Sequence, residues 1–214
     1  MDDWLSALLH RARADASRGA ATGDPERSGP RAYERLATWS VRAAAREPRT
    51  ARPARDALAR VLTEQGHPVW AQEVAACALA GAGDRRAFET LVFLLNYREP
   101  VRASAAAEAL ARLGDPRTAR AAAALAGNEL RTAYALEPVR LLARLGAPES
   151  VPVLVATLRR LLAGPGHYWP IARACVEGLG VLRDVRARPV LTAATGFPQL
   201  RETATTALAR LPRP

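Results

Sequence analysis

The chain has 214 residues, of which 49% are hydrophobic and 5% aromatic, and its formal net charge is +10. No stretch approaches the roughly 18 apolar residues of a membrane helix, and the acidic start Met1-Asp2-Asp3-Trp4 is unlike a secretion signal. We therefore expect a cytoplasmic protein with no membrane partner, whose two cysteines, Cys77 and Cys175, are buried and reduced.

All 31 basic residues are arginine. One interpretation is the codon usage of a GC-rich bacterial genome, which also explains the abundance of alanine, glycine and proline. The other is an anionic partner, because arginine makes forked contacts with phosphate. The arginines are spread along the whole chain, and this spread argues against one dedicated nucleic-acid face.

The first part of the chain, residues 1–49, is predicted to be an atypical hairpin that caps a repeat array. A helix over residues 2–16 has one apolar face, and its partner helix spans 31–46. The connection over 17–30 is rich in Gly, Ser, Asp and Pro, which predicts a mobile loop.

The remainder, residues 50–211, repeats one phrase, Ala109-Leu110-Ala111-Arg112-Leu113-Gly114-Asp115-Pro116. Its equivalent glycines, Gly83, Gly114 and Gly146, lie 31 and 32 residues apart. Glycine is a natural end of a helix, and Asp-Pro is a natural start of the next, so the phrase marks stacked helical hairpins. The predicted first and second helices are 50–65 with 68–81, 84–96 with 101–113, 116–126 with 129–145, 148–162 with 168–182, and 185–195 with 198–211. We predict an all-α fold, a single domain over residues 1–214 that forms a right-handed superhelical solenoid of about six hairpins.

The stretch from Glu99 to Pro116 resembles HEAT-like repeats of the phycobilisome-lyase type, and the resemblance extends over roughly residues 50–211. It implies that the helix opening with Val-Arg lines the concave face, and that Asp and Arg at the turns pair between neighbouring repeats. It also implies, as one function, a bilin-lyase-like enzyme or accessory factor. The absence of a distinctive thiol, histidine or carboxylate cluster in the sequence counts against that function.

Aligning the second helices on their closing leucines places Glu108, Arg140 and Glu177 in one column. Their alternating charges predict either salt bridges between repeats or a charged groove that binds a partner. Catalysis by the two carboxylates is disfavoured, because an intervening arginine would keep both ionised. Pro138 should break the predicted 129–145 helix near Leu136, which adjusts the curvature of the array.

Two similar phrases, Gly66-His67-Pro68-Val69-Trp70 and Gly166-His167-Tyr168-Trp169-Pro170, open second helices. Their tryptophans are interpreted as caps of the core at the turn, and the alternative is a platform on which a partner's side chain or a base stacks. No two histidines have metal-ligand spacing, and the chain lacks the His-Glu pairs on which metal-binding HEAT-repeat hydroxylases depend. We expect no metal, cofactor or catalytic residue.

The densest basic stretch surrounds residues 47–53 and is interpreted first as solvated surface. Phosphate contact is the alternative, since HEAT-like DNA glycosylases hold duplex DNA in an arginine- and lysine-lined concavity. The chain resembles those enzymes in architecture only, because Asp84, Asp115 and Asp184 are turn residues and no second helix carries an aspartate. The arginines that would contact nucleic acid are Arg42, Arg46, Arg49, Arg52 and Arg55.

The predicted function is a non-enzymatic scaffold that binds a protein partner on its concave face. A nucleic-acid-binding solenoid and a bilin-lyase-like factor are the alternatives, and self-association stays open. The residues expected to contact the partner are Arg102, Glu108, Arg131, Tyr134, Arg140, Trp169, Arg173, Glu177 and Arg201.

Overall fold

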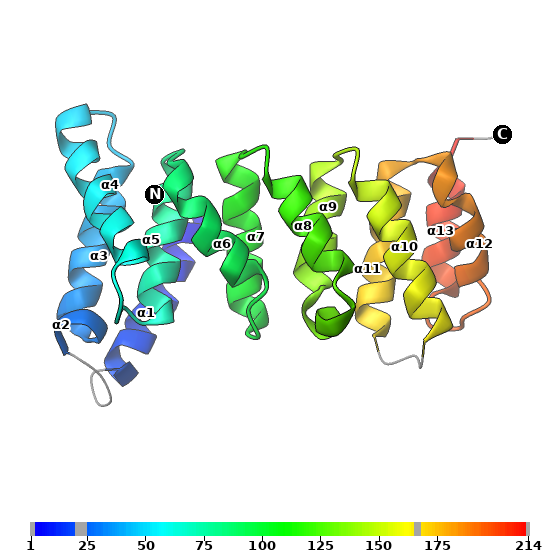
Figure 1. Cartoon of the computed structure of the whole chain (residues 1–214), viewed down its shortest axis with the longest axis horizontal. Helices are drawn as coiled ribbons and strands as arrows, with labels where there is room; N and C mark the ends of the chain where they lie inside the picture. The colour runs from blue at the N-terminus through cyan, green and yellow to red at the C-terminus, as the bar shows by residue number, and fades with distance from the viewer. Residues whose placement is uncertain (1–2, 20–24, 165–167, 213–214) are drawn as a thin grey trace. The chain divides into compact units, whose positions relative to one another are not determined.

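The computed structural model describes residues 3–19, 25–164 and 168–212. Every regular element in these ranges is a helix, which confirms the all-α prediction (Figure 1). In chain order the helices are α1 (Asp3–Gly19), α2 (Pro25–Ser28), α3 (Pro30–Ala43), α4 (Pro48–Thr63), α5 (Val69–Gly81), η1 (Arg85–Ala87), α6 (Phe88–Leu95), α7 (Pro100–Leu113), α8 (Thr118–Gly127), η2 (Glu129–Tyr134), α9 (Leu136–Leu145), α10 (Ser150–Ala163), α11 (Trp169–Leu182), η3 (Val185–Ala187), α12 (Arg188–Ala194) and α13 (Arg201–Arg210).

The helices alternate as first and second members of hairpins, which is the fold of a helical solenoid. They divide into two compact units. Unit 1 comprises residues 1–95 and 101–115, and unit 2 comprises residues 96–100 and 116–214. Each unit is described separately below.

The turns between hairpins have the geometry that the repeated phrase predicts. Gly83, Gly114 and Gly146 adopt left-handed backbone conformations with φ of 72°, 61° and 59°, and so end their helices without a steric penalty. Asp84 and Asp184 then cap the next helical turn, accepting hydrogen bonds from the backbone N–H two residues on at 3.1 and 2.8 Å.

The break expected near Leu136 is confirmed, because the predicted 129–145 helix is split into η2 and α9. Arg131, within η2, has non-helical dihedral angles (φ −125°, ψ 26°), and α9 begins at Leu136. Pro138 therefore stands in the first turn of α9, where its missing N–H removes no helical hydrogen bond.

In unit 1, helix α1 packs on its predicted partner and also on a second helix of the next hairpin. Helix α1 packs on both α3 and α5, and Figure 1 draws it behind α5. It buries Leu8, Leu9, Ala12 and Ala16 in this contact. Helix α1 thus packs against α3, as expected for the atypical N-terminal hairpin of residues 2–16 and 31–46, and α1 additionally covers α5.

The reason for this arrangement is the composition of α5. All its residues from Trp70 to Ala80 except Gln72 are buried, so the helix has no solvated stripe. A helix that is apolar on all sides must be covered on all sides. Helices α3, α4 and α6 cover three directions, and α1 covers the fourth.

The connection predicted as a loop over residues 17–30 is partly helical. Helix α1 continues to Gly19, and residues 25–28 form the short helix α2, while residues 20–24 lie outside the described residues. Side-chain contacts stabilise this four-residue helix: Arg35 of α3 bonds Glu26, and Arg27 donates to the carbonyl of Gln65. These tertiary contacts outweigh the loop-forming composition.

Unit 2 is a two-layered stack. The second helices α9, α11 and α13 pack side by side in one layer, and the first helices α8, α10 and α12 form the other (Figure 1). Two glycines of α11 permit the close packing: a Cβ at Gly178 would lie 2.7 Å from Ala143, and one at Gly180 would lie 2.8 Å from Ala207. Larger residues at either position would push the neighbouring second helix away.

Candidate functional site

The predicted contact residue Arg102 lies in a buried charge cluster in unit 1. Its guanidinium bonds Asp15 of α1 at 2.8 Å and also Glu73 of α5, which pairs with Arg11 of α1 as well. Glu73 is only 1% exposed. Burial raises the pKa of its carboxyl group, and the charges of Arg11 and Arg102 oppose that rise. The cluster joins α1, α5 and α7, so Arg102 does not face solvent.

Glu108, the other predicted contact residue in unit 1, lies on the same helix as Arg102. It accepts a hydrogen bond from Arg112 at 2.8 Å, and the Arg112 guanidinium lies 5.1 Å from the centre of the Trp4 ring. Helix α1 therefore contacts both ends of α7. In unit 1 part of the face expected to bind a partner is therefore in contact with the N-terminal helix, whereas Glu108 and Arg112 stay partly exposed.

Unit 2 leaves the corresponding face open. We call this surface, formed by the exposed sides of α9, α11 and α13, the unit 2 face. Arg140, Arg173, Glu177 and Arg201 are all exposed on it. Arg173 donates to the carbonyl of Gln199 at 3.1 Å, and Arg201 donates to that of Thr195 at 3.2 Å. Both guanidinium groups keep further donors for a partner, since each has five N–H groups.

The column of alternating charges does not form the expected ladder in unit 2. Arg140 pairs at 2.8 Å with Glu137 of its own helix, three residues earlier. Glu177 has no hydrogen bond or ion pair with any residue that the structure describes. The interpretation of these two residues as a salt bridge between repeats is therefore wrong, because a partner one helical turn away is closer than the next helix.

Exposed apolar and aromatic side chains lie immediately before the second helices α9 and α11 begin. Leu130 is 97% exposed, and Tyr134 and Tyr168 are also exposed. The Arg131 guanidinium stacks 4.4 Å from the centre of the Tyr134 ring, and it donates to the carbonyl of Asn96 at 3.0 Å. We call these residues the turn edge: Leu130, Arg131, Tyr134 and Tyr168.

Trp169 stands beside the turn edge but is largely structural. Its ring lies 5.7 Å from that of Phe197, tilted by 52°, and it joins the start of α11 to the turn before α13. Trp70 is buried, as the interpretation of a core cap predicted. His167, the neighbour of Tyr168, lies outside the described residues.

Sequence reasoning missed Leu130 and Tyr168 as surface residues. Leucine in a predicted helix is normally assigned to the core, and only the irregular η2 segment turns Leu130 outward. A signal was nevertheless present, since Asn128-Glu129 before it and Pro138 after it both indicate an interrupted helix.

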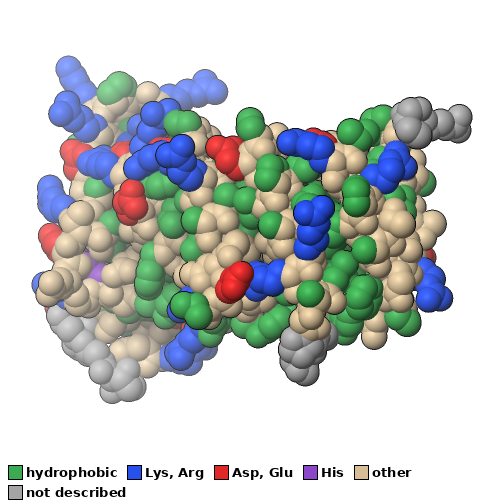
Figure 2. Space-filling view, turned by 45° about the vertical axis from the view of Figure 1, so that its right-hand side comes forward, with side chains coloured by type: hydrophobic (Ala, Val, Ile, Leu, Met, Phe, Trp, Pro, Cys, Tyr) green, Lys and Arg blue, Asp and Glu red, His purple; other side chains and the backbone are tan. Residues whose placement is uncertain are grey.

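The basic stretch forms an exposed patch at the turn between α3 and α4. Arginine side chains gather at the upper left of Figure 2, over this turn. Arg55 donates to the carbonyl of Ala43 at 3.0 Å and so helps to end α3. The other four are exposed and make no side-chain hydrogen bond or ion pair with described residues. These four, which we call the arginine patch, are Arg42, Arg46, Arg49 and Arg52.

Cys77 and Cys175 are buried free thiols, as predicted. Burial raises the pKa of Cys175 to about 12 and also raises that of Cys77, so neither is a ready nucleophile. The described residues include no group of three or more His, Cys, Asp or Glu that could hold a metal ion. None of the described helices has the length and apolar character to cross a membrane.

Comparison with known proteins corrects one expectation. No protein-family model matches the chain, and no curated protein matches it. Among solved structures, that of human deoxyhypusine hydroxylase in complex with glycerol is similar over 83% of this chain and 96% of its own, with 15% identity and a TM-score of 0.30. The prediction of a non-enzymatic protein is thereby corrected, because the structure found is that of an enzyme. A TM-score this low assigns no reaction, substrate or residue role to the chain.

Proposed function

We propose that the protein binds an acidic protein partner through the unit 2 face and its turn edge. The observation that carries the proposal is the turn edge itself, where the short helix η2 carries Leu130, which is 97% exposed, together with exposed Arg131 and Tyr134. Tyrosine and arginine are enriched among the residues that dominate binding energy at protein interfaces, and an exposed apolar group beside them favours association.

The adjoining helix supplies a matching stripe. Arg173, Glu177 and Val181 follow one another at helical spacing on the exposed side of α11, and Val181 is exposed as well. The three second helices of unit 2 hold five arginines and three glutamates. Charge complementarity therefore favours a partner whose surface is acidic and carries apolar side chains for the turn edge.

The test uses variants as baits for proteins in an extract of the native cell, followed by direct binding of each purified candidate. Tyr134→Ala and Arg173→Glu should each weaken binding about tenfold or more. Arg120→Glu is the matched control, since Arg120 is exposed on α8 in the other layer. The proposal is contradicted by a candidate whose affinity falls as much with Arg120→Glu as with the face variants. It is also contradicted by a candidate whose affinity neither Tyr134→Ala nor Arg173→Glu changes.

A second candidate function is nucleic-acid binding by the arginine patch. The favouring observation is that Arg42, Arg46, Arg49 and Arg52 are exposed without protein partners. Four cations at one turn can contact phosphates, and such binding is strongest at low salt because counterions are released. Fluorescence anisotropy with duplex DNA and with RNA at about 20 mM salt tests it. Absence of binding there, or equal binding by Arg46→Glu/Arg49→Glu, eliminates this candidate.

We also infer that the repeats are of the phycobilisome-lyase type. The supporting features are the Glu99–Pro116 phrase and the turn contacts that the resemblance implies. Arg86 pairs with Asp56 of the preceding hairpin at 2.8 Å, and Arg85 lies 4.0 Å from Asp115 of the following turn. Both contacts join neighbouring hairpins of unit 1. They concern the repeat type and assign no activity.

A further inference from the structure

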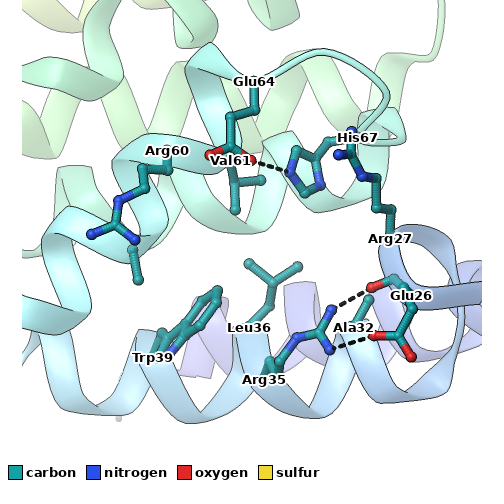
Figure 3. A pocket seen from close by; sticks show the side chains of 11 residues that line it. Glu26, Arg27, Ala32, Arg35, Leu36, Trp39, Arg60, Val61, Glu64 and His67 are labelled. Atoms are coloured by element: carbon teal, nitrogen blue, oxygen red, sulfur yellow. Dashed lines mark hydrogen bonds and ion pairs between the residues drawn. The ribbon is translucent and has the colours of Figure 1, made fainter.

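A cavity in unit 1, far along the sequence from the unit 2 face, has the composition of a ligand site. It encloses about 310 Å³ between α2, α3, α4 and the turn that follows α4. Figure 3 shows the side chains of α3 on one wall, those of α4 and His67 on the opposite wall, and α2 at one end. This volume is at the lower limit of small-molecule pockets, which are typically about 300–1,000 Å³.

Specific contacts hold the end wall in place. Arg27 of α2 donates to the carbonyl of Gln65 and lies against Gly66. Gly66 has φ of 87°, and a Cβ there would come within 2.9 Å of the Arg27 Nη1 atom. Arg35 of α3 meanwhile bonds both the carboxylate and the backbone carbonyl of Glu26. Helix α2 is thus fastened to both walls, and Gly66, whose positive φ favours glycine, also leaves room for the Arg27 side chain.

The interior is apolar with one unused donor. Leu36 and Val61 are buried in its walls, and in Figure 3 Trp39 lies next to Leu36 on the α3 wall, at the Arg60 end. Trp39 is half-buried, and its indole N–H donates to no described residue. A flat ring could stack here or lie against the two aliphatic side chains.

The charges at the rim leave one cation without a partner. Glu26 is paired with Arg35 at 3.2 Å, and Glu64 lies 3.6 Å from His67. The side chain of Arg60, at the Trp39 end of the cavity, makes no hydrogen bond or ion pair with the described residues. Because Glu26 is already paired with Arg35, the Arg60 guanidinium leaves a positive charge at this rim that an anionic ligand would neutralise.

We propose that this cavity binds a small aromatic carboxylate, with the ring against Trp39, Leu36 and Val61 and the carboxylate on Arg60. A guanidinium forms charge-assisted, bidentate hydrogen bonds with a carboxylate, so a carboxylate ligand binds more tightly than a neutral one of the same shape. The site is independent of the partner-binding function proposed for unit 2.

The test is an NMR titration that follows the four tryptophan indole N–H signals, assigned with Trp39→Phe. The probe is 2-naphthoate, and its neutral and cationic counterparts are 2-naphthamide and 2-naphthylmethylamine. The carboxylate should shift the Trp39 signal selectively and bind about tenfold more tightly than the amide. Arg60→Gln should remove that preference. Arg49→Gln, an exposed arginine of the same helix outside the cavity, should leave it unchanged.

Three results would overturn the proposal. One is the absence of a Trp39 shift with naphthoate at concentrations up to about 10 mM, because a dissociation constant above that value is too weak for a specific site. Another is equal affinity for the carboxylate and the amide in the unmodified protein, a comparison that needs no variant to fold. The last is an equal loss with Arg49→Gln and Arg60→Gln, which would indicate attraction by the basic surface in general.

Discussion

In the described part of the chain, four residues in left-handed conformation directly precede the Asp or Ala that begins the next hairpin. Three of them are the glycines Gly83, Gly114 and Gly146. The fourth, Arg183, has φ of 54° and ends α11. Residues with a Cβ pay about 1–2 kcal/mol in this region. Its side chain makes no hydrogen bond or ion pair with described residues, so nothing evident offsets that strain.

Arg183→Gly is therefore expected to stabilise the protein by about 1 kcal/mol, because the strain is relieved while the N–H bond to Leu179 remains. The reverse change, Gly146→Ala, should destabilise the protein by a similar amount, because alanine is strained at the φ of 59°. The added Cβ would lie at an ordinary 3.7 Å from Leu182, so no clash adds to this cost. Urea unfolding at neutral pH measures both. If Arg183→Gly instead lowers the free energy of unfolding, the Arg183 side chain makes a stabilising contact that outweighs the backbone strain.

The turn aspartate Asp84 should make the stability of the protein depend on pH in the acid range. Hydrogen bonds from Arg86 hold the pKa of Asp84 below its ordinary value of 3.8. A carboxyl group with a lowered folded pKa contributes its full stability above the unfolded pKa of about 3.9, and loses it as pH falls through the folded pKa. Asp84→Asn keeps a capping oxygen but loses the charge.

At pH 7 the Asp84→Asn variant should be less stable than the unmodified protein by roughly 0.5 kcal/mol, because Arg86 is partly exposed and the ion pair is screened. The difference should shrink as pH falls below about 4. Urea midpoints between pH 7 and pH 3 test this. A difference that stays constant over this range would mean that the charge of Asp84 does not contribute.

At the scale of elements, the contact of α1 with α5 and α7 determines what unit 1 can do. Helix α5 contributes one buried carboxylate, Glu73, and the arginines that neutralise it come from α1 and α7. The same contact covers part of the second-helix face of unit 1. The exposed partner surface is thereby left to unit 2, where α11 has a solvated stripe and α5 has none.

Glu73→Ala is expected to destabilise the protein by about 3–5 kcal/mol, because Arg11 would lose its carboxylate partner and Arg102 would keep only Asp15. Glu177→Ala, on the equivalent second helix of unit 2, is the matched control and should change stability by less than about 0.5 kcal/mol. Replacing Arg11, Glu73 and Arg102 together by methionine should recover much of the loss, since buried ion networks often tolerate apolar replacement. A small effect of Glu73→Ala would show that the cluster does not hold α1.

At the scale of the whole molecule, each unit contains one buried thiol, Cys77 in unit 1 and Cys175 in unit 2. In repeat proteins stability is local, because each hairpin contacts only its neighbours. The two thiols can therefore report separately on the opening of the two units.

Leu36 and Leu142 are buried in units 1 and 2 respectively, and truncating either to alanine should cost about 2–5 kcal/mol. Leu36→Ala should accelerate the modification of Cys77 by a thiol reagent more than that of Cys175, and Leu142→Ala should do the opposite. The rate of thiol labelling is measured in variants that retain only Cys77 or only Cys175, so that the opening of each unit is followed separately. Equal acceleration of both thiols by either change would indicate one cooperative solenoid, as predicted from the sequence for residues 1–214.

The sequence by itself determined the local structure: the helices, the glycine turns, the break before Pro138 and the burial of both cysteines. These depend on backbone propensity, capping and periodicity within a few residues. Only the tertiary structure decided which groups meet across long separations. Helix α5 is apolar on all sides in the sequence, yet nothing local identifies α1 as its cover. Arg140 pairs locally with Glu137, three residues earlier. Helix α2, by contrast, closes a cavity between α3 and α4, because packing selects among partners that the sequence leaves equivalent.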